Sequence, residues 1–244
     1  MARAIPLEEL KVFTRSNPPG KDFDYASGAA FVVHKPKGWT SFKVVAVLRK
    51  CLNLKKIGHA GTLDPMAEGV LILCCGRGTR TISQFQELEK VYTGEVTLGA
   101  TTPSRDAETA IEAEAPWEHI TRVNLDWTLE KHFSGEIMQV PPMYSALKHQ
   151  GKPLYKLARK GQVVERKPRQ VSIYKVEVLN FTPPTVELRI TCSKGTYIRS
   201  IAYDLGRYLN SLGYLSRLER DAIGPYTDEE ALTIEDLNHI FLDS

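Results

Sequence analysis

Residues 58–75 read GHAGTLDPMAEGVLILCC. A loop with three glycines and one aspartate, Asp64, runs directly into the apolar segment Val70–Cys75, which predicts a buried strand. Glycines permit unusual backbone angles and close backbone approach, as active-site loops often require. Upstream, apolar residues recur at helical spacing within Ser41–Leu52, so we expect a helix there with Ser41 as its N-cap.

The rest of the chain switches irregularly between strand-like and helix-like segments. We expect strands at Ala30–His34, Val91–Leu98, Val171–Leu179 and Thr185–Cys192, and helices at Thr79–Leu88, from Asn124, at Pro153–Lys160 and from Tyr197 to Gly213. This order predicts the α+β class, with a mixed, largely antiparallel β-sheet flanked by helices, rather than a doubly wound α/β fold. Turn-forming residues at 17–20 favour an N-terminal extension over 1–28 and one domain over 29–244.

Composition excludes several classes of protein. Of the 244 residues, 42% are hydrophobic and 25% charged, which is ordinary globular usage and not that of a disordered chain. No apolar run approaches the ~20 residues of a membrane span, and the start lacks the apolar core of a signal peptide, so we expect a cytoplasmic protein. The four cysteines show no metal-ligand spacing, and we expect neither a metal site nor a disulfide.

Basic residues are concentrated in two blocks, although the net charge is only +3. The first basic block, residues 35–56, has seven Lys and Arg and no acid. The second basic block, residues 148–169, has eight Lys and Arg against Glu165 alone. Such runs are often only solvated surface, but two of them in a nearly neutral chain favour a polyanionic partner such as a nucleic acid.

Asp64 is the only acid between Ala29 and Ala67, so a positive surrounding should keep it ionised and able to act as a nucleophile. An Asp-Pro turn without chemistry remains an alternative for this residue. A glycosidase using Asp64 and Glu68 is a further alternative, although basic surroundings are unusual for that chemistry. Gly76-Arg77-Gly78-Thr79 before a helix is a weak indication of a phosphate site.

Five segments in the same chain order resemble the TruB family of tRNA pseudouridine-55 synthases. The strongest is the stretch from Gly58 to Leu71, which resembles the catalytic motif of that family. The others are His34–Ser41, Lys90–Tyr92, Pro142–Lys148 and Ser193–Ser200. The resemblance covers about residues 31–235 and implies a pseudouridine synthase-like fold and the isomerisation of a T-loop uridine after base flipping.

The resemblance also implies a role for individual residues. Asp64 would attack the everted uridine, at the base or at the ribose anomeric carbon, and Arg199 would pair with Asp64 and orient it. Tyr92 would lie against the uracil face. Further substrate-binding positions implied by the motifs are His59, which would insert where the base was, Tyr197 and Leu215 in the base pocket, and Arg80, Tyr144 and Lys148 towards the RNA.

The chain also departs from the family pattern. His34 stands where relatives usually have Asp, and the loop Thr101–Asp106 is less rich in Asp and Gly, so that only Asp106 is a plausible match. Too little chain follows the last motif for the PUA domain of most relatives, so we expect the catalytic domain alone and no guide RNA. We expect a monomer that acts on the T-arm of tRNA without cofactor or metal. An RNA-binding module with vestigial chemistry is the alternative.

Overall fold

The computed structural model describes residues 3–242, which form two compact units. One unit combines residues 3–91 with 219–242, and the other consists of residues 92–218. We call them the terminal unit and the central unit. The chain passes between them at the start of strand β5 (Lys90–Leu98) and within strand β13 (Gly213–Ile223).

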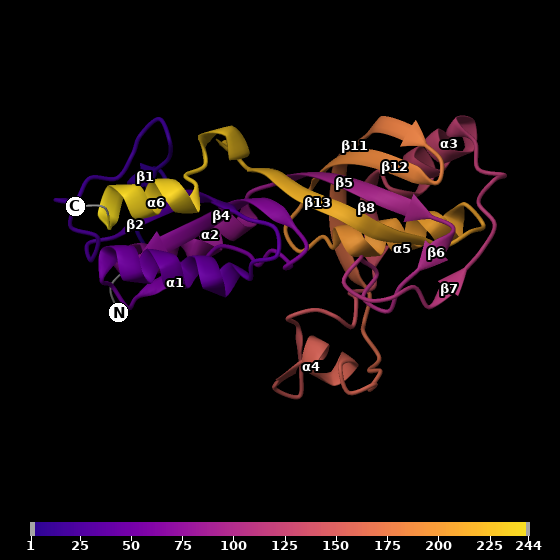
Figure 1. Cartoon of the computed structure of the whole chain (residues 1–244), viewed down its shortest axis with the longest axis horizontal. Coiled ribbons are helices and arrows are strands. Elements are labelled where there is room, and N and C mark those ends of the chain that lie inside the picture. Colours follow the sequence, from indigo (N-terminus) through magenta and orange to yellow (C-terminus); the bar gives the residue numbers. More distant parts are fainter. Residues whose placement is uncertain (1–2, 243–244) are drawn as a thin grey trace. The chain divides into compact units, whose positions relative to one another are not determined.

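The terminal unit is built on a mixed sheet in the order β1-β2-β4-β13 (Figure 1). Its strands are β1 (Val12–Phe13), β2 (Ala29–Lys35), β4 (Glu68–Cys75) and the second half of β13, with β3 (Ile57–His59) paired to β4 and β14 (Tyr226–Thr227) to β13. Its helices are α1 (Ser41–Leu52), η1 (Gly76–Thr81), α2 (Ile82–Glu87), η2 (Asp228–Glu230) and α6 (Ile234–Phe241). The β2–β4 pair is antiparallel, whereas β13 runs parallel to β4.

Both faces of this sheet are buried, which explains the continuous apolar run of β4. Phe31, Val33, Leu71 and Leu73 pack on one face with residues of α1 and α6. The alternate residues of β2 and β4, Val32 and Ile72 among them, pack on the other face with Phe85 of α2. Cys74 and Cys75 fall into these two different clusters, as the alternation of side chains along a strand predicts.

The segment before β2 contributes to the same core. Leu10, Phe13 and Tyr25 are buried, and β1 pairs in parallel with β2. Gly76 lies so close to this segment that an added Cβ would approach the carbonyl oxygens of Tyr25 and Ala26 to 2.4 Å. Residues of the expected extension are therefore packed against the sheet and its helices from Ile5 onwards.

The central unit has the strand order β13-β5-β12-β11-β8, with β8 (Gly135–Gln139), β11 (Arg169–Thr182) and β12 (Thr185–Cys192) in antiparallel register. Its helices are α3 (Arg122–His132), α4 (Leu154–Ala158) and α5 (Ile198–Tyr208). The short strands are β6 (Ala100–Thr101), β7 (Ala113–Glu114), β9 (Lys148–His149) and β10 (Lys152–Pro153). In Figure 1 the segment that carries α4 extends away from the sheet of its own unit.

The mostly antiparallel mixed sheet with flanking helices confirms the α+β prediction. Some local expectations were wrong. Thr40, not Ser41, caps α1, because its hydroxyl accepts the backbone N–H of Lys43. Helix α3 begins at Arg122 with Thr121 as its cap, two residues before the start that we expect at Asn124. Gly213 opens the long strand β13 and does not merely end a helix, so that α5 ends at Tyr208.

Candidate functional site

The loop that carries Asp64 joins β3 to β4 and is held along its length. The Ser41 hydroxyl exchanges two hydrogen bonds with the backbone of Leu63, at 3.0 and 3.2 Å, in a buried position. The backbone N–H of Gly38 donates to the carbonyl oxygen of Pro65 at 2.7 Å. Asp64 lies between these two attachment points and is only partly buried, so its carboxylate belongs to a loop with a fixed backbone.

Arg220 of β13 supports the loop from beneath. Its side chain is 2% exposed, and it donates to the carbonyl oxygens of Val70 at 2.7 Å and Gly61 at 3.4 Å. Gly61 and Gly69 have φ angles of +105° and +100°, and a Cβ on Gly69 would approach the Arg220 carbonyl oxygen to 2.4 Å. Both glycines are therefore required by backbone conformation or by close approach, as the sequence predicts.

His59 lies on β3, at the start of the same loop. Its ring is partly buried, and its Nδ1 is buried without a hydrogen-bond partner of normal geometry among residues 3–242. Burial lowers the pKa of His59, Arg220 lowers it further, and the backbone of Gly61 opposes the shift. The imidazole is therefore neutral near pH 7 and acts as an aromatic ring rather than a cation.

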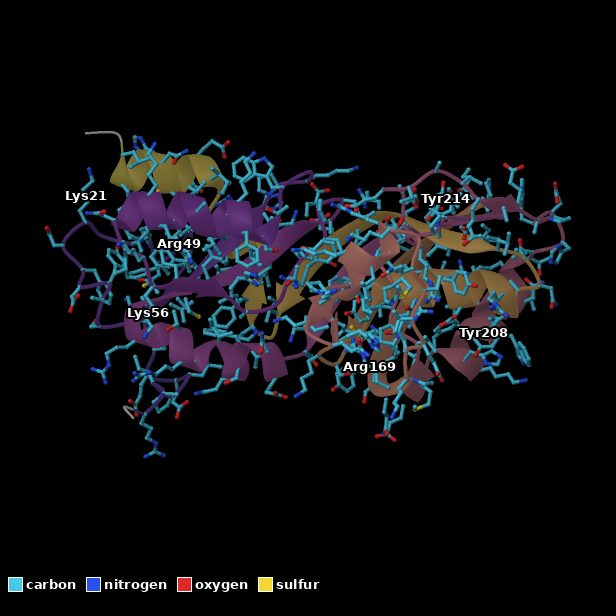
Figure 2. The ribbon with its side chains drawn as sticks, turned by 90° about the horizontal axis from the view of Figure 1, so that it is seen from below. Lys21, Arg49, Lys56, Arg169, Tyr208 and Tyr214 are labelled. Carbon is cyan, nitrogen blue, oxygen red and sulfur yellow. The ribbon has the colours of Figure 1, made fainter. Side chains whose placement is uncertain are left out.

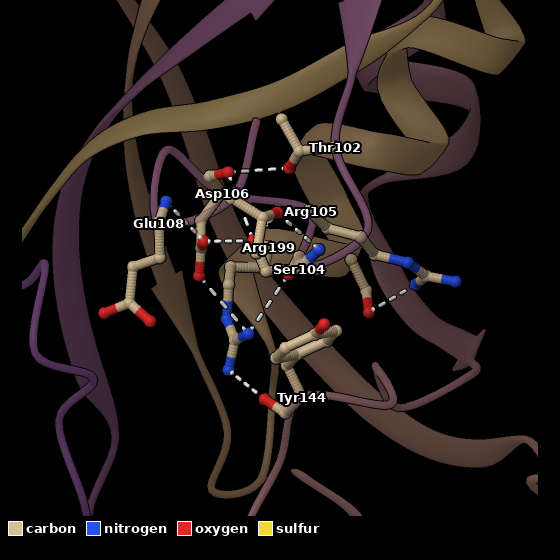
Figure 3. Close-up of polar contacts among 9 residues, drawn as sticks. Thr102, Ser104, Arg105, Asp106, Glu108, Tyr144 and Arg199 are labelled. Atoms are coloured by element: carbon tan, nitrogen blue, oxygen red, sulfur yellow. Dashed lines mark hydrogen bonds and ion pairs between the residues drawn. The ribbon is translucent and has the colours of Figure 1, made fainter. Parts of the chain in front are cut away.

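Arg199 is the centre of a buried polar network in the central unit (Figure 3). Its Nη1 lies 3.3 Å from Oδ2 of Asp106 and donates to the carbonyl oxygen of Ser104 at 3.1 Å. Its Nη2 donates to the carbonyl oxygen of Tyr144 at 2.8 Å. The side chains of Arg199 and Asp106 are 4% and 1% exposed, so the two charges are fixed and withdrawn from water.

Asp106 is itself enclosed by donors from its own loop. Oδ1 accepts hydrogen bonds from the Ser104 hydroxyl at 2.5 Å and from the backbone N–H of Glu108 at 3.0 Å. The neighbouring Arg105 adopts a φ of +64°, which is unusual for a residue with a side chain. Two backbone hydrogen bonds hold this turn, from Leu215 N–H to the Arg105 carbonyl and from Ala107 N–H to the Leu215 carbonyl, both at 3.1 Å.

The other central-unit residues implied by the resemblance lie on well-defined elements. Tyr92 is on β5, Leu215 is buried on β13, and Tyr197 is the N-cap residue of α5. The side-chain amide of Gln139 accepts a hydrogen bond from the Tyr197 N–H and donates one to the Tyr197 carbonyl oxygen. The guanidinium of Arg169 stands 4.7 Å above the Tyr197 ring. Tyr144 reaches Arg199 through its carbonyl, so its ring is left for other contacts.

The two basic blocks are largely solvent-facing. In the first block six of the seven cations are exposed, and two of them, Arg49 and Lys56, are labelled in Figure 2. The seventh, Lys35, is buried, and its ammonium donates to the carbonyl oxygens of Pro36 and Trp39. In the second block Lys148 and five others are exposed, while Arg166 and Arg169 are partly buried. Arg80 on η1 is also exposed.

His34, the departure from the family pattern, has a carboxylate partner from another element. Its Nδ1 lies 2.8 and 3.0 Å from the two carboxylate oxygens of Asp228 on η2. This contact raises the pKa of His34, although partial burial opposes the rise. A histidine from β2 and an aspartate from η2 are thus paired at the position where the motif resemblance leads us to expect an aspartate.

Three residues that hold Asp64 or Arg199 in place have no clear signal in the sequence. Asp106 was considered only as a plausible match, and its burial against Arg199 cannot be seen in a loop of Thr, Pro and Ser. Arg220 has no motif around it, and Ser41 was assigned to helix capping. Its position 22 residues from Leu63 gives no sequence signal for their hydrogen bonds.

Two features are absent from residues 3–242. Within that range no group of three or more His, Cys, Asp or Glu side chains has an arrangement that would hold a metal ion. None of the helices there combines the length and the apolar character needed to cross a bilayer. Cys51, Cys74, Cys75 and Cys192 are free thiols.

The chain matches the TruB family pseudouridylate synthase (N terminal domain) over residues 49–198. It is 47% identical over 215 residues to the tRNA pseudouridine synthase B of Bacteroides fragilis, covering 86% of this chain and 92% of that protein. A protein of the same name from Francisella philomiragia is 46% identical over 210 residues, covering 86% of this chain and 69% of that protein.

Among solved structures, a chain in the crystal structure of a Cbf5-Nop10-Gar1 complex superposes with a TM-score of 0.68 at 28% identity. The superposition covers 95% of this chain and 60% of that chain. The family match spans more than half of the sequence, includes the Asp64 loop and ends directly before Arg199. On this evidence the chain belongs to the TruB family of pseudouridylate synthases.

Proposed function

We propose that the protein is a tRNA pseudouridine synthase that converts the T-loop uridine at position 55 into pseudouridine. The observation that carries the proposal is Asp64, on a loop fixed at Leu63 and Pro65 within the matched family region. The Bacteroides fragilis relative named tRNA pseudouridine synthase B is matched over 92% of its length, which supports tRNA as the substrate.

The proposed reaction is an isomerisation in which every atom is retained. The bond between N1 of uracil and C1′ of ribose breaks, the base rotates, and a bond between C5 and C1′ forms. The proton on C5 is lost and N1 gains a proton, so that no oxidant, reductant or group acceptor takes part. The reaction therefore needs no cofactor, but it does require a base removed from its stack and a nucleophile screened from water.

We assign the chemical steps to three residues. Asp64 attacks the everted uridine, at the base or at the anomeric carbon, and Arg199 keeps the Asp64 carboxylate oriented and ionised. Tyr92 lies against the uracil and assists the removal of the C5 proton. In support, the Arg199 guanidinium is already fixed by Asp106 and two carbonyl oxygens, so its direction does not depend on the substrate.

The remaining residues bind RNA in this proposal. Tyr197 and Leu215 line the base pocket, and His59 occupies the place that the everted base leaves. Arg80, Tyr144 and Lys148 contact the RNA around it, and the exposed cations of the two basic blocks neutralise phosphates. We infer a cytoplasmic monomer that recognises the tRNA T-arm directly, without a guide RNA.

The second candidate is an RNA-binding module whose chemistry has been lost. The presence of Asp64, Tyr92 and Arg199 favours the enzyme, because a silent relative would be free to lose any of the three. An unmodified T-arm hairpin incubated with the protein, then mapped for pseudouridine at each uridine, separates the two. Pseudouridine at the T-loop position supports the enzyme, whereas tight binding without any isomerisation supports the module.

A further inference from the structure

Phe42, the second residue of α1, places an aromatic ring in water. The helix buries Ser41, Val44, Val45 and Leu48 against the sheet, and Phe42 points to the other side with 71% of its surface exposed. A phenyl ring that is mostly exposed buries little apolar surface and so stabilises the fold little. We therefore look for a ligand that would cover it.

Among the residues that the structure describes, His59 is the aromatic neighbour of the Phe42 ring. The two ring centroids are 5.5 Å apart and the planes are nearly perpendicular, at 87°. This edge-to-face arrangement is favourable for an aromatic pair. His59 also contributes a buried Nδ1 without a hydrogen-bond partner of normal geometry among residues 3–242. Phe42 therefore presents its ring on the solvent side of α1, and His59, partly buried on β3, contacts it at the start of the Asp64 loop.

The surroundings of this pair are positively charged. Lys43 directly follows Phe42, and its ammonium stands 3.6 Å from the centroid of the Trp39 ring. Lys37 is exposed a few residues earlier, and Arg49 and Lys50 are exposed later on the helix. No acid except Asp64 occurs between residues 29 and 67. A ligand of these rings must thus combine a flat apolar face with negative charge.

An unpaired nucleotide of RNA has that combination, since its base stacks on aromatic rings while its phosphate pairs with nearby cations. We propose that Phe42, in edge-to-face contact with His59, offers a stacking face to one unpaired base of the substrate RNA, a base other than the everted uridine, with Lys43 at its phosphate. The inference rests on the proposed function and adds to it a specific contact that selects RNA with an unpaired loop.

The test compares Phe42→Leu, which removes the ring, with Phe42→Tyr, which retains it. Trp127→Leu is the matched control, because Trp127 is also an exposed aromatic residue, 56% exposed on α3, and has a lysine, Lys131, near its ring. The substrate is an unmodified T-arm hairpin carrying 2-aminopurine at one unpaired loop position at a time. Single-turnover rates, half-saturating RNA concentrations and 2-aminopurine fluorescence are measured for each variant, and circular dichroism checks the fold.

Loss of the ring should raise the half-saturating hairpin concentration roughly five- to tenfold, the lower part of the range for one base–aromatic stack. The rate at saturating RNA should stay within about twofold, because Phe42 does not touch the reacting atoms. At one loop position 2-aminopurine should be quenched by wild type and by Phe42→Tyr, but not by Phe42→Leu. Trp127→Leu should behave as wild type in every measurement.

Equal half-saturating concentrations and equal quenching for wild type and Phe42→Leu would overturn the inference. A lower saturating rate with unchanged affinity would also overturn it, since Phe42 would then act on the Asp64 loop and not on RNA. If wild type does not isomerise the hairpin at all, the proposed function fails. The equilibrium binding and fluorescence comparison would still decide the role of Phe42.

Discussion

The carboxylate of Asp106 lies 3.3 Å from the guanidinium of Arg199, and the two side chains are 1% and 4% exposed. A buried ion pair stabilises a fold little when complete, but the removal of one partner is costly, because the remaining buried charge loses a counter-charge. The Ser104 hydroxyl and the Glu108 N–H, which donate to the same carboxylate, make the Asp106 charge still more costly to replace.

Asp106→Asn should therefore lower the free energy of unfolding by about 3 to 5 kcal/mol, as measured by urea denaturation. The matched control is Asp126→Asn on α3, which removes the partner of Arg122 from a pair that is 51% exposed on both sides. That exposed pair should cost less than about 1 kcal/mol. Equal losses in the two variants would show that Asp106 does not compensate the charge of Arg199.

Arg199→Lys should retain RNA binding and lose turnover. A lysine ammonium cannot reproduce the planar fork that reaches Asp106, Ser104 and Tyr144 at once, so the cation at this site would be misplaced. A displacement of about 1 Å in a positioned group can cost roughly 100-fold in rate. Single-turnover kinetics with saturating hairpin measure the loss, and an unchanged rate would contradict the orienting role.

Asp64→Asn should abolish detectable isomerisation, because the amide keeps the size of the side chain but is not a nucleophile. Hairpin affinity should change by no more than a few-fold, since Ser41, Gly38 and Arg220 hold the backbone of the loop. Pseudouridine mapping and filter binding give the two readouts. Substantial product from this variant would remove Asp64 from the mechanism.

The second basic block should contribute to RNA binding in a salt-dependent way. Replacement of Lys148, Lys152 and Lys156 by Gln should weaken binding across RNA sequences, and the slope of log K against log salt should flatten by about 0.7 to 0.9 for each lost phosphate contact. The control replaces Lys11, Lys131 and Lys175, which lie outside both blocks. Identical slopes for the two triple variants would show that the second basic block is ordinary solvated surface and does not contact RNA phosphates.

The His34–Asp228 pair should make stability depend on pH. The pKa of His34 is raised above its unfolded value of about 6.5, so the pair stabilises the fold fully below that pH and loses its effect as pH rises through the folded-state pKa. Wild type should exceed His34→Asn in unfolding free energy more at about pH 5.5 than at about pH 9. Asp228→Asn should remove most of that increment, because Asp228 raises the pKa of His34 most while Glu68 and Glu219 raise it less, and the double variant should add little to the loss in His34→Asn.

The sequence predicts the elements whose side chains repeat at a clear period. The continuous apolar run of β4 and the stripe Val44–Leu48 on α1 both carry their burial in local spacing, and both are where we expect them. The strand β13 is less visible, because it alternates charged residues such as Arg217 and Glu219 with apolar ones directly after a helix. At Gly213 the helical spacing of apolar residues stops, and from the sequence this indicates the end of a helix more clearly than the start of a strand.

The same distinction applies to the candidate site. Motif order brings out Asp64 and Arg199 because each stands in a recognisable run of residues. Asp106 and Arg220 act through contacts with residues more than 90 positions away in the sequence. Their burial depends on how the strands are arranged, and a single sequence has no local pattern that reports it. Polar residues that support a site are for this reason harder to predict than those that react.

The backbone around Asp64 is attached at Gly61, Leu63, Pro65 and Val70 before any RNA arrives. A loop held in this way has little freedom to follow a nucleotide that is presented in a different position. In the proposed reaction the adjustment must then come from the RNA, which has to unstack the uridine and bring it to the carboxylate. The choice among uridines thus depends on the energy that each RNA loop requires to release its base, and a paired or well-stacked uridine is rejected before chemistry begins.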